Sequence, residues 1–138
     1  MFKEKYKQLI DNGFCIIEDV LSERLLNQCR IETDRLCQSD SEENRKRFQS
    51  QGSMLSAMSH PIFAELIAWQ KSFDALMSMG FKNPTFTDGY IISKPPRSPK
   101  LFWHYDWFAW DDPTVYHPRP PQVFFMYYLI DTTSHNGC

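Results

Sequence analysis

The 138-residue sequence has no apolar run of about 18 residues, so it offers no candidate for a helix that spans a bilayer. Its opening stretch, MFKEKYKQLIDNGF, is charged and amphipathic, and it lacks the apolar core of a secretory signal peptide. Neither sign of charge predominates, because the chain has 15 Lys and Arg residues and 17 Asp and Glu residues, for a net charge of −2. This balance argues against binding to nucleic acid or to an anionic membrane.

The spacing of the cysteines argues against two common kinds of site. The four cysteines form no CxxC pair, which argues against a zinc knuckle and against a dithiol redox motif. We therefore expect reduced thiols in a cytoplasmic protein. The length of the chain suits a single domain.

Residues 1–80 have the pattern of a mainly helical region. Apolar residues recur at helical spacing from Phe2 to Ile10, and Gly13 is typical of the residue that ends a helix. Ser22 is a typical N-cap for a second helix, which we expect to end near Gln38. Two further helical segments follow, one with a proline in its first turn at residue 61 and one over residues 73–79 that ends at a glycine.

Two other segments of this region do not read as helix. Residues 14–20, FCIIEDV, are short, apolar and β-branched, which predicts a strand. Residues 39–53 are nearly all polar, which predicts a solvated loop.

From residue 81 onward the pattern changes to strands. Residues 85–94, 101–108 and 122–133 are rich in β-branched and aromatic side chains, and proline-rich connections separate them. A Ser-His-Asn-Gly turn follows the last of these segments. The predicted fold class is therefore α+β, with an N-terminal helical part over residues 1–80 and antiparallel strands over residues 81–138.

The aromatic-rich stretch FWHYDWFAWDDP, residues 102–113, contains the pattern His104-x-Asp106. Side chains two residues apart on a strand point to the same face, so His104 and Asp106 are predicted to project together. An imidazole and a carboxylate on one face can bind a divalent metal, and two histidines with one carboxylate form the facial triad of non-haem Fe(II) oxygenases. The alternative for these residues alone is a histidine hydrogen-bonded to a nearby aspartate in a packed sheet.

The order of several motifs resembles the phytanoyl-CoA dioxygenase family of Fe(II)/2-oxoglutarate oxygenases. A strand leads into Lys-Pro-Pro, a Trp-His-x-Asp motif follows, and a long apolar strand precedes an Asp-x-Thr…Asn-Gly-Cys turn. The opening FKEKYKQLIDNGFCIIEDVLSERLLNQC is similar to the helix, strand and helix with which the family begins.

This resemblance implies a double-stranded β-helix, or jelly-roll, with helices packed on its first half. It implies that His104 and Asp106 are metal ligands, that the cofactors are Fe(II) and the cosubstrate 2-oxoglutarate, and that O2 and a small organic molecule are the other substrates. It also implies that Tyr90 and Met126 line the cosubstrate pocket. The aromatic residues around the motif suit either an apolar substrate pocket or the core. Of these, Phe108 is the predicted substrate-pocket residue, because Tyr105 and Trp107 would share the face of the strand opposite the metal.

The family's third ligand is a histidine in a Pro-Gly-Ser/Thr-His motif shortly after the Asn-Gly turn, and a basic residue beyond it pairs with 2-oxoglutarate. The sequence ends at Cys138 directly after that turn, so we expect a C-terminally truncated chain with an incomplete barrel and an incomplete metal site. We expect this chain alone to bind iron weakly and to show absent or poor turnover. The remaining histidines have simpler roles: His117 and His135 are expected at the surface, and His60 at the start of a helix.

Two alternatives without redox chemistry stay open. One is a non-catalytic jelly-roll that serves as a binding or interaction module, and the other is a jelly-roll that binds a sugar or another small ligand without a metal. Asp111 and Asp112, which precede Pro113, are predicted to be turn formers rather than acid or base catalysts. The sequence does not indicate an oligomeric state.

Overall fold

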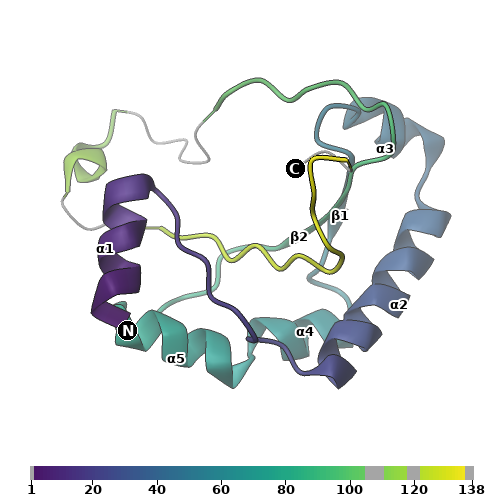
Figure 1. Cartoon of the computed structure of the whole chain (residues 1–138). Coiled ribbons are helices and arrows are strands. Elements are labelled where there is room, and N and C mark those ends of the chain that lie inside the picture. Colours follow the sequence, from purple (N-terminus) through teal and green to yellow (C-terminus); the bar gives the residue numbers. More distant parts are fainter. Residues whose placement is uncertain (1, 105–110, 118–121, 136–138) are drawn as a thin grey trace. The chain divides into compact units, whose positions relative to one another are not determined.

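The computed structural model describes residues 2–104, 111–117 and 122–135, and the chain divides into two compact units, residues 1–99 and 100–138 (Figure 1). The first unit holds five helices and a two-stranded antiparallel sheet among its described residues. The predicted α+β class is confirmed at this level. No helix of the described residues is long and apolar enough to cross a membrane.

The first two helices begin and end close to where the sequence signals place them. Helix α1, Phe2–Asn12, ends at Gly13, which has a φ of 79° and donates its backbone N–H to the Leu9 carbonyl at 2.9 Å. Helix α2, Glu23–Ser39, begins after Ser22, whose hydroxyl accepts a hydrogen bond from the Leu25 N–H at 3.3 Å. Glu23 in its first turn complements the helix dipole.

The next helix, α3, lies inside the segment that the sequence predicted to be a loop, so that prediction was wrong. Helix α3 spans Glu42–Arg47, and Ser41 caps it by accepting from the Asn44 N–H at 3.0 Å. Its first turn is acidic and its last turn is basic, which matches the helix dipole, and Lys46 pairs with Glu42 at 2.9 Å. The high polarity of these residues thus marks an exposed short helix rather than irregular chain.

Helices α4, Pro61–Ile67, and α5, Gln70–Ser78, confirm the two later helical predictions. Pro61 occupies the first turn of α4, where a missing N–H costs no intrahelical bond. Helix α5 is followed by Gly80 at a φ of 86°. Between the two helices, the Trp69 side chain donates from Nε1 to the Val20 carbonyl at 2.7 Å.

The sheet of the first unit consists of β1, Ser53–Ser56, and β2, Tyr90–Ser93 (Figure 1). Its register pairs Met54 with Ile92 and Leu55 with Ile91. Exposure alternates along β2: Ile91 is 8% exposed, whereas its neighbour Ile92 is 58% exposed. One face of the sheet is therefore part of the core, and the other, which carries Tyr90 and Ile92, is open.

The core of the first unit lies between α2, α4, α5 and the inner face of the sheet. Leu25 and Cys29 of α2 are fully buried, and α2 packs against both α4 and β1. The remaining buried apolar side chains come from the later elements: Ala57, Phe63, Leu66, Ala75, Leu76, Met79 and Ile91. Helix α1 packs on α5, and the Tyr6 ring meets the Phe81 ring edge-on at 6.3 Å.

None of the predicted strands is present over its full predicted length in the described residues. Residues 14–20 belong to neither strand; Asp19 has a φ of 55°, which interrupts the extended chain, and its carbonyl accepts from the Lys71 ammonium at 3.1 Å. Only Tyr90–Ser93 of the predicted strand 85–94 is paired. Residues 122–133 were predicted as the clearest strand and belong to no strand either.

In the second unit, the described residues form one short helical element, the 3-10 helix η1, Pro113–Tyr116. Asp112 caps it by accepting a hydrogen bond from the Thr114 N–H at 2.8 Å. The hydrogen bonds with the backbone and side chain of Thr114 lower the pKa of the Asp112 carboxyl. The prediction of Asp112 as a turn former is thus confirmed. The two strands of the described residues both lie in the first unit, so they do not establish the predicted jelly-roll.

Candidate functional site

The predicted metal motif begins at His104, in a segment of irregular chain. Residues 101–104 belong to no strand, contrary to the strand predicted over 101–108, and Asp106 and Phe108 lie outside the described residues. Leu101 to His104 line a shallow surface recess of about 360 Å³. Trp103 is fully exposed, and Phe102 is 73% exposed.

Contacts of the His104 imidazole define its orientation. Its Nδ1 atom lies 2.9 Å from the Phe102 carbonyl oxygen, and its ring meets the Phe102 ring edge-on at 5.5 Å. A carbonyl oxygen can only accept a hydrogen bond, so in the neutral ring the proton belongs to Nδ1. The lone pair of the ring then lies on Nε2, which is the atom that a metal would bind.

This arrangement fits a metal ligand. A histidine that binds a metal usually donates its other ring N–H to a carbonyl or a carboxylate, which fixes the tautomer and aims the ring. The His104–Phe102 bond does both within three residues of chain. Among residues 2–104, 111–117 and 122–135, no three His, Cys, Asp or Glu side chains gather closely enough to hold a metal ion.

Tyr90, predicted to line the cosubstrate pocket, is the first residue of β2 and is 51% exposed on the open face of the sheet. Its hydroxyl donates to Asp88 Oδ2 at 2.5 Å, and Asp88 Oδ1 accepts from the Gly89 N–H at 2.7 Å. The hydrogen bond to the Asp88 carboxylate, with the charge of that carboxylate, raises the pKa of the Tyr90 phenol.

Sequence reasoning missed Asp88 as a partner of Tyr90. Asp88 lies in the predicted strand 85–94, and Asp88-x-Tyr90 has the same i, i+2 spacing as His104-x-Asp106. On extended chain that spacing places two side chains on one face, and it is the signal that could have found the pair.

Met126, the other predicted cosubstrate residue, is 70% exposed in segment 122–130, which belongs to no helix or strand. The neighbouring Phe125 and Tyr127 rings stack on each other at 5.9 Å with an interplanar angle of 14°. The role of Met126 as a cosubstrate residue stays a prediction.

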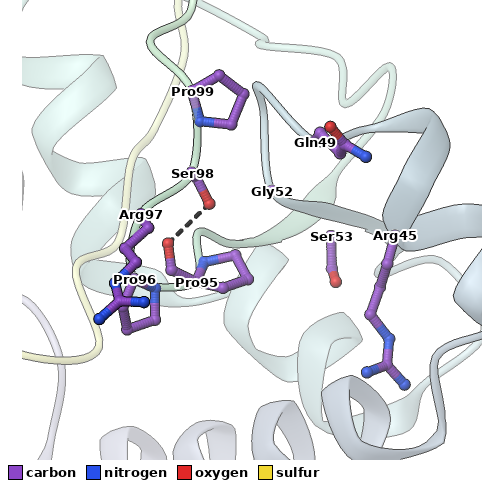
Figure 2. Close-up of a pocket in the computed structure, with 9 residues that line it drawn as sticks. All are labelled: Arg45, Gln49, Gly52, Ser53, Pro95, Pro96, Arg97, Ser98 and Pro99. Atoms are coloured by element: carbon purple, nitrogen blue, oxygen red, sulfur yellow. Dashed lines mark hydrogen bonds between the residues drawn. The ribbon is translucent and has the colours of Figure 1, made fainter.

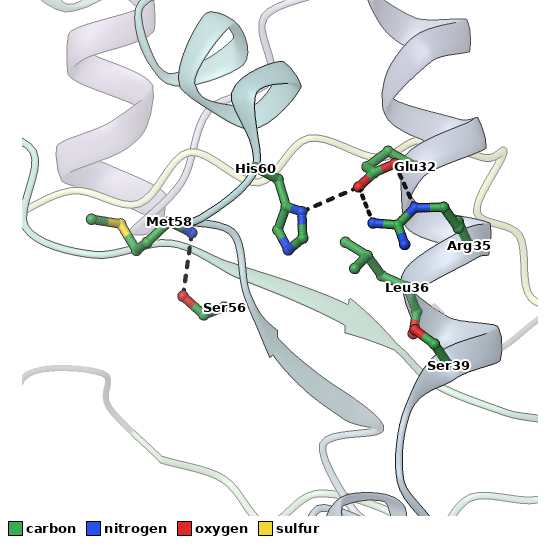
Figure 3. Close-up of polar contacts among 7 residues, drawn as sticks. All are labelled: Glu32, Arg35, Leu36, Ser39, Ser56, Met58 and His60. Carbon is green, nitrogen blue, oxygen red and sulfur yellow. Dashed lines mark hydrogen bonds and ion pairs between the residues drawn. The ribbon is translucent and has the colours of Figure 1, made fainter.

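Figure 3 shows His60, which the sequence predicted to start a helix, and it is the N-cap residue of α4. Its Nδ1 lies 3.2 Å from Glu32 Oε1, and Arg35 donates two hydrogen bonds to the same carboxylate at 2.9 and 2.6 Å. The Arg35 guanidinium, aided by His60, lowers the pKa of Glu32. This cluster ties α4 to α2, and its histidine has a structural role.

The other two histidines lie at the surface, as expected. His117 is exposed and caps η1 through its backbone N–H, which donates to the Thr114 carbonyl at 3.0 Å. His135 is exposed in the turn at residues 134–135, and its N–H donates to Thr133 Oγ1 at 3.2 Å.

A second surface pocket, of about 210 Å³, lies between the proline turn 95–99 and the chain around Gly52 and Ser53 (Figure 2). Its two cationic side chains, Arg45 and Arg97, lie on opposite sides of it in Figure 2. Arg45 is also engaged by the Asp40 carbonyl, which accepts from its Nε at 3.2 Å and its Nη2 at 2.5 Å. The two guanidinium groups do not converge on one point, and we assign no ligand to this pocket.

Comparison with known proteins gives one family match. The sequence model of the phytanoyl-CoA dioxygenase family matches residues 9–138, which covers both units of the chain. Searches of curated proteins and of solved structures found no match.

Proposed function

The chain belongs to the phytanoyl-CoA dioxygenase family, and we propose that it is a non-haem Fe(II)/2-oxoglutarate-dependent dioxygenase that hydroxylates a small organic substrate. Oxygenase function with Fe(II) and 2-oxoglutarate is the activity of the family. Our proposal concerns which residues of this chain bind the iron, the cosubstrate and the substrate.

The observation that carries the proposal is the hydrogen bond between His104 Nδ1 and the Phe102 carbonyl. It supports His104 as an iron ligand through Nε2, because it sets the tautomer that binds a metal. We assign Asp106 as the second ligand because it occupies the carboxylate position of the Trp-His-x-Asp motif, which resembles the metal motif of the family. Neutral imidazole and carboxylate together are a donor set that suits ferrous iron.

When bound, the iron and 2-oxoglutarate would supply the oxidising chemistry, with O2 as the oxidant and succinate as the coproduct. The residues of this chain would bind and orient the metal and the substrates, and they would exclude water from the site. As the family resemblance implies, His104 and Asp106 would hold the metal, and Tyr90 and Met126 would be cosubstrate residues. Phe108 would contribute to an apolar wall for the substrate.

We also place the protein in the cytoplasm. The described cysteines, Cys15, Cys29 and Cys37, are free thiols, and free thiols are typical of a reducing compartment. Cys29 is fully buried, and burial raises the pKa of its thiol, so it is a packing residue rather than a nucleophile.

The proposal is tested by Fe(II)-dependent formation of succinate from 2-oxoglutarate by the full-length protein. His104→Ala and Asp106→Ala are each expected to reduce the rate to the level seen without iron. His117→Ala is the matched control, because it removes an exposed histidine of the same unit and is expected to keep the wild-type rate. Wild-type activity in either ligand variant would refute the ligand assignment. Ligand binding that needs no metal, without succinate formation, would favour a non-catalytic binding module.

A further inference from the structure

The two aromatic side chains of the recess at residues 101–104 differ in what they contact. The Phe102 ring meets the His104 imidazole edge-on at 5.5 Å, and the Phe102 carbonyl oxygen lies 2.9 Å from His104 Nδ1. Phe102 therefore supports the proposed iron ligand. Trp103 lines the same recess and is fully exposed, so its whole indole is accessible to a molecule that enters.

An accessible indole beside a recess is typical of a place where a ligand binds. Tryptophan is highly buried on average in folded proteins, and small-molecule sites are lined mainly by apolar and aromatic side chains. The recess beside Trp103 has a volume of about 360 Å³, and such sites usually measure about 300–1,000 Å³. The exposed indole and the recess together therefore fit a small molecule.

The side chains that line this recess favour an uncharged molecule. Among the described lining residues, Leu101, Phe102 and Trp103 are apolar, and the His104 imidazole is the one polar side chain. A phosphate or carboxylate that entered would lose water and would meet no lysine or arginine among these residues. A flat aromatic ring gains both from the burial of its apolar surface and from stacking on the indole.

We propose that Trp103 binds the flat ring of an uncharged aromatic substrate and holds that ring beside His104. The inference rests on the proposed function, because it takes the recess next to the proposed iron ligand as the place where the substrate binds. Trp103 directly precedes His104, and consecutive Cα atoms lie about 3.8 Å apart, so a ring stacked on the indole stays close to the imidazole. Trp103 is thus a substrate-binding residue that selects for aromatic, uncharged molecules.

The test is the dissociation constant of 2-naphthylmethanol, an uncharged two-ring alcohol, measured by a ligand-detected NMR titration of the metal-free protein. Trp103→Ala is expected to weaken binding by at least about fivefold, because it removes the indole on which the ring stacks. Trp103→Phe keeps an aromatic ring and is expected to lose only about twofold. Tyr116→Ala is the matched control, because it removes another exposed aromatic side chain of the same unit, and it is expected to keep the wild-type affinity.

Two further probes test the chemical class of the ligand. 2-Naphthoate has the same rings with a carboxylate, and 1-octanol is an alcohol without a ring. Wild type is expected to bind each of them at least about fivefold more weakly than 2-naphthylmethanol. Trp103→Ala is expected to lose most of the preference for 2-naphthylmethanol over 1-octanol, because stacking on the indole is the source of that preference.

The position of the ring beside His104 has a separate measurement. Mn(II) is paramagnetic and is bound by the same kinds of ligand as Fe(II). In protein loaded with Mn(II), the ring protons of 2-naphthylmethanol are expected to relax faster than in metal-free protein, and His104→Ala is expected to abolish this difference. If the protein binds both Mn(II) and the ring without faster relaxation, the placement beside His104 is wrong.

The outcomes separate this inference from the proposed function. Equal affinity of wild type and Trp103→Ala for 2-naphthylmethanol, or equal affinity of wild type for 2-naphthylmethanol and 2-naphthoate, would overturn the inference while Fe(II)-dependent succinate formation still held. Absence of succinate formation with ring binding intact would refute the proposed function alone. A dimer that Trp103→Ala dissociates in sedimentation, with unchanged affinity for the ring, would assign the indole to an interface between copies and would also overturn the inference. Should Trp103→Ala not fold, Trp103→Leu, which keeps an apolar side chain without a ring, carries the same test.

Discussion

Gly52 lies directly against the backbone of Ser93, at the point where β1 begins and β2 ends. A Cβ atom on residue 52 would stand 2.6 Å from the Ser93 carbonyl carbon and 2.9 Å from Lys94 Cα, and the φ of Gly52 is 94°. Both the close approach and the positive φ require glycine. The two strands meet in register because this residue has no side chain.

We expect Gly52→Ala to lower the free energy of unfolding by about 2 kcal/mol or more, since it adds a clash with backbone to the cost of a left-handed conformation. Gly13→Ala is the matched control. Gly13 also has a positive φ, of 79°, but no atom lies within 4 Å of the position of its Cβ. Urea denaturation of both variants measures the difference, and equal losses would contradict the close approach.

Ser22→Ala is expected to lower the free energy of unfolding by about 1 kcal/mol, because it leaves the Leu25 N–H at the start of α2 without its side-chain acceptor. Ser22→Asp keeps an acceptor at the N-cap and is expected to stay near wild type. The midpoint of urea denaturation at an unchanged m-value reports the effect. A loss in Ser22→Asp as large as that in Ser22→Ala would show that the hydroxyl does not act as a cap.

Glu32 makes the stability depend on pH in a defined direction. Arg35 and His60 lower the pKa of the folded-state carboxyl, so the ionised form stabilises the fold above the unfolded-state pKa of about 4.3. This contribution is lost as the pH falls through the lower folded-state pKa. We expect the stability difference between wild type and Glu32→Gln to be largest near pH 6 and to shrink toward pH 3.

The matched control is Asp34→Asn, an exposed carboxyl on the same helix. Its stability difference from wild type is expected to change less over the same pH range. A difference for Glu32→Gln that stayed constant from pH 6 to pH 3 would contradict the role of the Glu32–Arg35–His60 cluster.

Helix ends were predictable because their signals are local. Ser22, Pro61 and Gly13 each act on hydrogen bonds within a few residues, and the structure places a helix boundary at each. Helix α3 was missed although its signals were present. The Ser41 cap and the acidic-to-basic order of its charges were outweighed in the prediction by the polarity of the whole segment.

Strands were less predictable, because a strand needs a partner that can lie anywhere in the chain. Residues 14–20 and 122–133 have the composition of strands but no place in the sheet. Strand β1, Ser53–Ser56, has a weak pattern and is paired with β2, more than 30 residues away. Strand propensity thus indicates that a segment could fit into a sheet, but it does not identify the strand with which that segment pairs.

For the candidate site, the sequence predicts residue types and their spacing. The sequence predicted His104 and Asp106 from their i, i+2 spacing and from the family resemblance, and the family is now established by the match over residues 9–138. The hydrogen bond from His104 to the Phe102 carbonyl depends on the path of the backbone and cannot be read from residue types. The same holds for the hydrogen bond that the Tyr90 hydroxyl donates to Asp88.

The central claim is that His104 binds ferrous iron. The most direct test is an anaerobic calorimetric titration of the protein with Fe(II). We predict that His104→Ala weakens binding by more than about tenfold, whereas His117→Ala retains the wild-type affinity. Equal Fe(II) affinity in wild type and His104→Ala would contradict the account.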